Sequence, residues 1–255
     1  MLSTGPPKVD VFGVGLSVTD YEDATVRIIE AGTAKQSFAM SALATHGLME
    51  AVHDPSFREV VNNLDLVTPD GQPVRWAMNI LHDSGLNDRV YGPDLTWKVC
   101  GAAADAGVGI YLFGSTAETC EAFVDAVLDE WPHAVISDVQ PDRFRDATEE
   151  EDAADIERIN NSGAGVVLVG RGCPRQEKWV GAHKGSVNAA MMAVGAAFDY
   201  HAGQLKKPPP VMQKYGLEWL WRLSLEPKRL FKRYLVTNSQ YCFELAKAVA
   251  RKRLR

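Results

Sequence analysis

The sequence predicts an α/β fold: a Rossmann-like, mostly parallel sheet with helices on both faces, followed by a basic helical appendage. Three observations carry this prediction. Apolar runs of strand length alternate with helix-length segments, several helix starts carry cap signals, and the charge balance reverses near residue 206. With 255 residues and 46% hydrophobic composition, the chain is long enough to bury a full core. We therefore expect an α/β core over residues 1–205 and an appendage over residues 206–255.

The expected strands are short apolar runs that lie between longer helical segments. Strands of a parallel sheet are buried on both faces, so they are nearly continuous in hydrophobic residues. Runs of this kind occupy residues 9–18, 37–42, 64–68, 108–113, 134–139, 166–169 and 189–196.

Cap signals indicate where four of the helices begin. Asp20 is a candidate N-cap, and Pro93 follows Gly92 at a first-turn position, where proline is tolerated. The other two starts have the capping-box spacing, in which a hydroxyl residue is followed three positions later by Glu. These pairs are Ser115 with Glu118 and Thr148 with Glu151.

The last 50 residues differ from the rest of the chain in charge. They contain 13 Lys and Arg against three Asp and Glu, whereas the whole chain has a net charge of −6, so residues 1–205 carry about −16. We expect one helix over residues 216–225 and another that starts at Pro227. One face of the second helix is apolar and either packs on the core or lies on an anionic lipid surface. Its residues are Leu230, Tyr234, Tyr241, Leu245 and Val249.

Several classes of protein are disfavoured by what the sequence lacks. It has no apolar run near the roughly 20 residues that span a bilayer and no signal peptide, so we expect a cytoplasmic protein. The four cysteines lack C-x-x-C spacing and are expected to be reduced thiols. A complete dinucleotide fingerprint, a Walker loop and a Gly-x-Ser-x-Gly elbow are missing. Without an Asp-x-Asp pair the sequence nominates no metal site, and we expect no cofactor.

Candidate functional residues lie in the turns between strands and helices, because doubly wound sheets bind ligands beyond the carboxyl ends of their strands. Asp70 ends a strand in the turn Pro69-Asp70-Gly71, where its carboxylate is placed to act as a general base, although a plain Asp-Gly turn is the alternative. Gly114 and Ser115 open a helix whose free N–H groups suit a phosphate.

Two further turns carry polar side chains. Residues 169–177 combine glycines with Arg171, Arg175 and Glu177 in a turn that opens a helix, and these donors can pair with phosphate or sugar hydroxyls. Asp199 and His201 follow a strand of small residues. A lone histidine is more often structural than catalytic, so we expect a structural His201.

Six motifs occur in order along most of the chain, and together they are far more specific than any one of them. They are Asp54-Pro55-x-Phe57, Pro69-Asp70-Gly71, Arg89-Val90-x-Gly92-x-Asp94-Leu95, Gly170-x-Gly172-Cys173-Pro174-Arg175-Gln176-Glu177, Phe198-Asp199 and Gly216-Leu217-Glu218-Trp219-Leu220-x-Arg222-Leu223-x-x-Glu226-Pro227-x-Arg229-Leu230. In these motifs the chain resembles the WecG/TagA/CpsF family of bacterial glycosyltransferases.

The resemblance implies a metal-independent, inverting enzyme that acts on the cytoplasmic face of the membrane in cell-surface polysaccharide or glycolipid assembly. The donor would be a UDP-sugar and the acceptor a polyprenyl-diphosphate-linked sugar, with the appendage docked on anionic lipid. It implies Asp70 as the base, Arg89 and Gln176 in the pocket, and Arg222, Arg229 and Arg233 near a diphosphate. We assign nucleotide binding to Gly114, Ser115, Gly170, Gly172, Cys173, Pro174, Glu177 and Asp199.

One departure from the family pattern leaves the donor sugar open. Where much of the family has Thr-x-Asn, this chain has Ala42-Leu43-Ala44, so Thr45 or His46 would have to replace those polar groups. The alternative is a non-catalytic protein that binds UDP-sugars or lipid-linked glycans, against which the retained Asp70 and Arg89 argue. We expect no nucleic-acid partner because the acidic core would repel phosphates. The sequence leaves open whether the chain forms a homo-oligomer.

Overall fold

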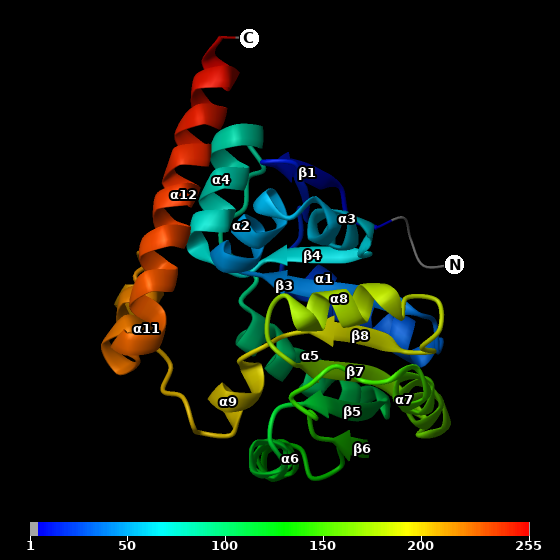
Figure 1. Ribbon diagram of the computed structural model, residues 1–255. Coiled ribbons are helices and arrows are strands. Elements are labelled where there is room, and N and C mark those ends of the chain that lie inside the picture. The colour runs from blue at the N-terminus through cyan, green and yellow to red at the C-terminus, as the bar shows by residue number, and fades with distance from the viewer. Residues whose placement is uncertain (1–4, 255) are drawn as a thin grey trace.

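The computed structural model describes residues 5–254 and is built on one six-stranded sheet (Figure 1). Its strands are β3 (Phe38–Leu43), β4 (Leu66–Pro69), β5 (Gly109–Gly114), β6 (Ile136–Gln140), β7 (Ala164–Gly170) and β8 (Ala190–Ala193). They lie in the order β4-β3-β8-β7-β5-β6, and every neighbouring pair is parallel. The predicted α/β fold with a mostly parallel sheet is therefore confirmed.

The expected strand over residues 9–18 is wrong as a single strand. β1 (Lys8–Val11) and β2 (Val14–Ser17) form a separate antiparallel hairpin. The chain reverses at Phe12 and Gly13, whose φ angles are 59° and 91°. Positive φ at both central residues is the geometry of a two-residue hairpin turn, and a phenylalanine there gives no turn signal in the sequence.

Two helical layers cover the sheet. One face packs against α1 (Tyr21–Thr33), α5 (Gly92–Ala106), α6 (Ala117–Glu130) and α9 (Ala197–His201). The other face packs against the hairpin and α2 (Thr45–His53), α3 (Pro55–Asn63), α4 (Gln72–His82), α7 (Glu149–Asn161) and α8 (Arg175–Ala182). Strand β7 shows the alternation that feeds both layers: Val167 and Val169 join the second core, whereas Val166 and Leu168 join the first.

Three of the four predicted helix starts are confirmed. Asp20 caps α1, Pro93 lies in the first turn of α5, and Thr148 forms a complete capping box with Glu151 at the start of α7. The start predicted at Ser115 is wrong by one residue, because Thr116 is the N-cap of α6. Ser115 has a φ of 57° and belongs to the preceding turn.

The appendage consists of α10 (Pro210–Lys214), α11 (Glu218–Leu225) and α12 (Pro227–Arg253), and α12 begins at the predicted proline. In Figure 1, α12 runs beside α4 and ends at the C-terminus. Of the two alternatives for its apolar face, packing on the core is the one observed. Leu230 and Tyr241 are buried, Leu245 packs on the core, and the Tyr241 hydroxyl donates to the Pro73 carbonyl.

Candidate active site

A cavity of about 640 Å³ opens where five neighbouring strands of the sheet end. The carboxyl ends of parallel strands meet at one edge, so residues far apart in the sequence line it together. Across the sheet these are Asp70 after β4, Ala42 near the end of β3, Gly195 after β8, Gly170 at the end of β7 and Ser115 after β5. Helices α11 and α12 form another wall, so the cavity lies between the core and the appendage.

Asp70 is half-buried at the β4 end of the cavity. Its Oδ1 accepts a hydrogen bond from the backbone N–H of Gly92. A Cβ on Gly92 would lie 3.1 Å from that oxygen and 3.1 Å from the Ala42 Cβ, so only glycine fits without a shift of its neighbours. Burial raises the pKa of Asp70 to about 6, although the nearby Arg89 guanidinium acts in the opposite direction. At neutral pH the carboxylate is therefore ionised and more basic than an ordinary aspartate.

Arg89 lies behind the cavity wall rather than in it. Its guanidinium makes a bidentate ion pair with the carboxylate of Glu218 on α11 and stacks 4.2 Å from the centre of the Tyr91 ring. Glu218 and Tyr91 line the cavity in its place. Arg89 therefore ties the appendage to the core beside Asp70.

The glycine-rich turn after β7 supplies the middle of the cavity with Gly172, Cys173, Gln176 and Glu177. Both polar atoms of Gln176 make a hydrogen bond: Oε1 accepts from the Gly172 N–H at 3.1 Å, and Nε2 donates to Glu177 Oε1 at 2.9 Å. Gly114 and Pro174, which were also assigned to the nucleotide, lie next to lining residues but not in the lining themselves.

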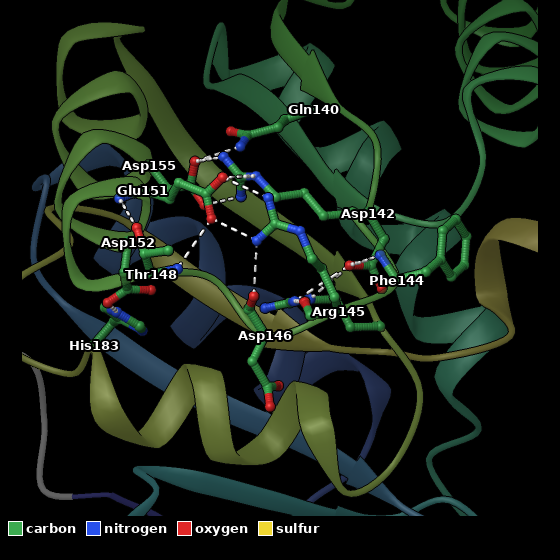
Figure 2. Close-up of polar contacts among 12 residues, drawn as sticks. Gln140, Asp142, Phe144, Arg145, Asp146, Thr148, Glu151, Asp152, Asp155 and His183 are labelled. Atoms are coloured by element: carbon green, nitrogen blue, oxygen red, sulfur yellow. Dashed lines mark hydrogen bonds and ion pairs between the residues drawn. The ribbon is translucent and has the colours of Figure 1, made fainter.

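Arg171 and Arg175 of the same turn point away from the cavity and pair with Asp142 at 3.2 Å each. The Asp142 backbone N–H donates to the Ser115 carbonyl at 2.9 Å, so one residue braces two of the turns that line the cavity. Figure 2 shows Asp142 within the polar network of the β6–α7 loop, where Arg145 pairs with Glu151. The arginine donors that the sequence offered for a phosphate are thus used within the protein.

The appendage contributes Arg222 and Arg233 to the cavity. Their Nε atoms are buried, and neither has a hydrogen-bond partner among residues 5–254. A buried N–H donor without a partner is unfavourable, which makes these two side chains candidates for binding an anion. The side chain of Arg229 lies outside the part of the chain that the structure describes.

Thr45 and His46, at the start of α2, also line the cavity. His46 Nδ1 lies 3.7 Å from Glu50 Oε1 and is buried without a hydrogen-bond partner in the described part of the chain. Burial, and then the charge of Arg233, lower the pKa of His46. The imidazole is therefore neutral at physiological pH and presents one donor and one acceptor.

The two polar residues at the β8 end behave differently from each other. Asp199 lines the cavity. His201 Nε2 lies 2.7 Å from the Pro93 carbonyl, and its ring stacks on Trp97 with centroids 4.4 Å apart. His201 is thus held in the packing of α5 and α9, in line with the structural role expected for it.

Several lining residues were not predicted from the sequence. Glu218 and Trp219 lie within the last of the six motifs, and Tyr91 lies within the third, so the motifs were a signal for them. The others carry no motif that could have identified them; they are Gln72, Tyr200, Gln204, Tyr234, Thr237 and Asn238.

Among residues 5–254, no group of three or more His, Cys, Asp and Glu side chains is arranged to hold a metal ion. None of the helices in that range is long and apolar enough to cross a membrane.

The family model for the glycosyl transferase WecG/TagA/CpsF family matches residues 9–255, which is nearly the whole chain. The match includes both the strand ends that line the cavity and the appendage that closes it.

Proposed function

The chain belongs to the WecG/TagA/CpsF family of glycosyltransferases, and we propose that it transfers a sugar from UDP to a polyprenyl-diphosphate-linked sugar with inversion. The family acts in cell-surface polysaccharide assembly and implies a sugar-nucleotide donor and a lipid-linked acceptor. One observation carries the finer proposal: a carboxylate of raised pKa, Asp70, shares a cavity with two arginines whose buried Nε atoms have no hydrogen-bond partner in the described chain.

Asp70 would act as the general base. In an inverting transfer the acceptor hydroxyl attacks the anomeric carbon from the side opposite UDP, so a single carboxylate beside the hydroxyl suffices. The new C–O bond forms as the bond to the phosphate oxygen breaks, and Asp70 takes the hydroxyl proton. The Gly92 N–H holds Oδ1, which leaves Oδ2 to meet the hydroxyl.

The departing UDP carries negative charge that the protein must stabilise. Arg222 and Arg233 line the cavity, and the buried Nε atom of each has no hydrogen-bond partner among residues 5–254. Fixed donors of this kind stabilise a diphosphate as it leaves, so we propose a reaction without a metal ion.

The appendage would dock on the cytoplasmic face of the membrane. Its charge is strongly positive, and the side of α12 away from the core exposes large apolar groups. Basic and apolar side chains together suit an anionic lipid surface. The large apolar side chains exposed over residues 210–253 are those of Val211, Tyr215, Leu217, Leu220, Leu225, Phe231, Leu235, Val236 and Phe243.

The alternative is a protein that binds a UDP-sugar or a lipid-linked glycan without turnover. The observation that favours it is the apolar lining at Ala42 and Ala44, where much of the family carries polar groups. The base and the arginines are retained, so transfer is the better-supported function.

A transfer assay separates these functions. The protein is incubated with a panel of UDP-sugars and a soluble, short-chain polyprenyl-diphosphate-linked sugar, with EDTA present, and UDP release and product mass are measured. We expect turnover with inverted anomeric configuration and no loss in EDTA. Thermal stabilisation by a UDP-sugar without turnover supports the binding protein. If EDTA abolishes turnover and Mg²⁺ or Mn²⁺ restores it, the metal-free account is wrong.

A further inference from the structure

The central part of the cavity wall is lined by small residues and one buried acid. In the strand order, β4 carries Asp70 at one end, and β7 and β5 carry the glycine turns at the other. Strands β3 and β8 lie between them and present Ala42, Ala44, Gly195 and Ala196 to the cavity. If UDP occupies the glycine turns and the acceptor hydroxyl meets Asp70, as the proposed function requires, the donor sugar lies over β3 and β8.

Glu177 is the acid in this central part. It lies in the first turn of α8, is 1% exposed and lines the cavity. Oε1 accepts two hydrogen bonds, from Ser41 Oγ of β3 at 3.2 Å and from Gln176 Nε2 at 2.9 Å. Oε2 is buried and has no hydrogen-bond partner among residues 5–254. The carboxyl group is therefore anchored through Oε1, and beyond these two bonds it interacts with the weak thiol donor of Cys173 and with its own backbone N–H.

Other polar groups nearby are less suited to contact the sugar. Both polar atoms of Gln176 are already bonded, and Ala42 and Ala44 offer none. Cys173 lies beside the carboxyl group, and burial raises the pKa of its thiol well above its ordinary value, so it stays a weak donor. Of Gln176, Cys173 and Glu177, only Glu177 has a side-chain oxygen without a hydrogen-bond partner among residues 5–254.

We infer that Glu177 selects the donor sugar, with Oε2 donating a hydrogen bond to an oxygen of a hydroxyl or acylamino substituent on the sugar ring. Burial raises the pKa of Glu177, which favours the neutral acid. Because Oε1 accepts from both Ser41 and Gln176, the proton of that acid belongs on Oε2. The residue contacts the sugar and leaves the UDP moiety to the glycine turns.

The test compares the affinities for UDP and for UDP-sugars in Glu177 variants. The dissociation constants of UDP, UDP-glucose and UDP-N-acetylglucosamine are measured by calorimetry for the wild type, Glu177→Gln and Glu177→Met. Glutamine keeps a donor at the same place. In Glu177→Gln the ratio of the dissociation constant of UDP to that of the bound UDP-sugar should therefore stay within about threefold of the wild-type ratio. Methionine removes the donor and should lower that preference about tenfold, with unchanged UDP affinity. Glu157→Met, an exposed position on α7, is the matched control and should change neither constant.

The outcomes distinguish the two levels of the proposal. Equal loss of affinity for UDP and UDP-sugar in Glu177→Met indicates a purely structural role and overturns the inference, as does an unchanged preference. If Glu177→Met does not fold, Glu177→Asp decides, because the shorter side chain withdraws Oε2 and should give the same selective loss. A wild-type protein that binds UDP-glucose, UDP-N-acetylglucosamine and the rest of the UDP-sugar panel no better than buffer overturns the proposed function itself.

Discussion

The two ends of the cavity hold their arginines in opposite ways. At the glycine-turn end, Arg171 and Arg175 pair with Asp142, and Arg143 pairs with Asp155 at 2.6 Å. At the appendage end, Arg222 and Arg233 face the cavity, and their buried Nε atoms have no partner in the described chain. An arginine that is paired within the protein stabilises the scaffold, whereas an arginine whose buried Nε makes no hydrogen bond can gain a partner when an anion binds.

The two ends of the cavity are expected to contribute differently to stability and to activity. The side chain of Asp142 is 2% exposed, so its pairing with Arg171 and Arg175 offsets the cost of burying its charge. Asp70, Arg222 and Arg233 lie at the other end, beside the appendage. We therefore expect substitutions at the glycine-turn end to lower stability first and substitutions at the appendage end to lower turnover first.

The largest effect is expected for Asp70→Asn, which tests whether the chemistry lies at the appendage end. Asparagine keeps the shape of the side chain and the acceptor for Gly92 but removes the base, so kcat should fall about 10²-fold or more. UDP affinity should not change. Turnover within a few-fold of wild type would remove Asp70 from the role of base.

The pH dependence of the same residue gives a second readout. Activity needs the ionised carboxylate, so kcat/KM of the wild type should fall as the pH drops below about 6. Folding raises the pKa of Asp70 above its ordinary value of 3.8, so its ionisation costs stability as the pH rises from about 4 to 6. At pH 7, Asp70→Asn should therefore melt at or above the melting temperature of the wild type. A lower melting temperature would contradict the argument that burial raises the pKa of Asp70.

The next effect compares one arginine from each end. Arg222→Gln should lower turnover on a soluble acceptor about 10- to 150-fold, because a charge-assisted hydrogen bond is worth about 1.5–3 kcal/mol. Its melting temperature should stay near that of wild type. Arg171→Gln is the matched variant at the glycine-turn end, where the loss of one partner of Asp142 should lower the melting temperature by a few degrees. Lower turnover in Arg171→Gln together with a lower melting temperature in Arg222→Gln would contradict this division between the two ends.

How far the sequence alone predicts this molecule depends on the range of the interaction. The six sheet strands were predictable because each is an apolar run between segments with helical caps. The strand-end turns at Asp70, Ser115 and Gly170 were predictable as site positions because parallel strands bring their carboxyl ends together. Both signals are local in the sequence. The hairpin turn is also local, but it was missed because its first central residue is Phe12, whereas Asn, Asp or Gly usually occupies that position.

Pairings across the chain were not predictable. Arg171 and Asp142 are 29 residues apart, and Arg89 and Glu218 are 129 residues apart. Each of these side chains is also common on a solvated surface, so the residue type does not indicate a partner. Which arginines bind within the protein and which face the cavity therefore emerges only from the packed structure.

A smaller effect is expected for Gly92→Ala, which changes the position of the Asp70 carboxylate without changing its chemistry. The added methyl group would lie 3.1 Å from Asp70 Oδ1 and 3.1 Å from the Ala42 Cβ, so the carboxylate must shift by a few tenths of an ångström. We expect kcat to fall about 5- to 10-fold, since such effects of misplacement are steep. The control is Ala104→Gly, which lies on the same helix as Gly92, α5. Gly107→Ala is unsuitable as a control because the φ of Gly107 is 64°, where a side chain is strained. Equal activity in Gly92→Ala and wild type would show that Asp70 needs no fixed position.

The smallest effect concerns the appendage as a membrane surface, where no single cation should dominate. Each basic residue near an anionic surface contributes about 1 kcal/mol, so Lys228→Gln at the exposed start of α12 should weaken binding to phosphatidylserine vesicles about fivefold at low salt. The difference should shrink as ionic strength rises, because the charges are screened. Lys98→Gln, exposed on α5 of the acidic core, is the matched control and should leave binding unchanged.

Lys228→Gln should also keep wild-type turnover on a soluble acceptor, unlike Arg222→Gln. Binding of the wild type to neutral and anionic vesicles alike would contradict the electrostatic part of the proposal, and a loss of soluble turnover in Lys228→Gln would place that lysine with the arginines of the cavity.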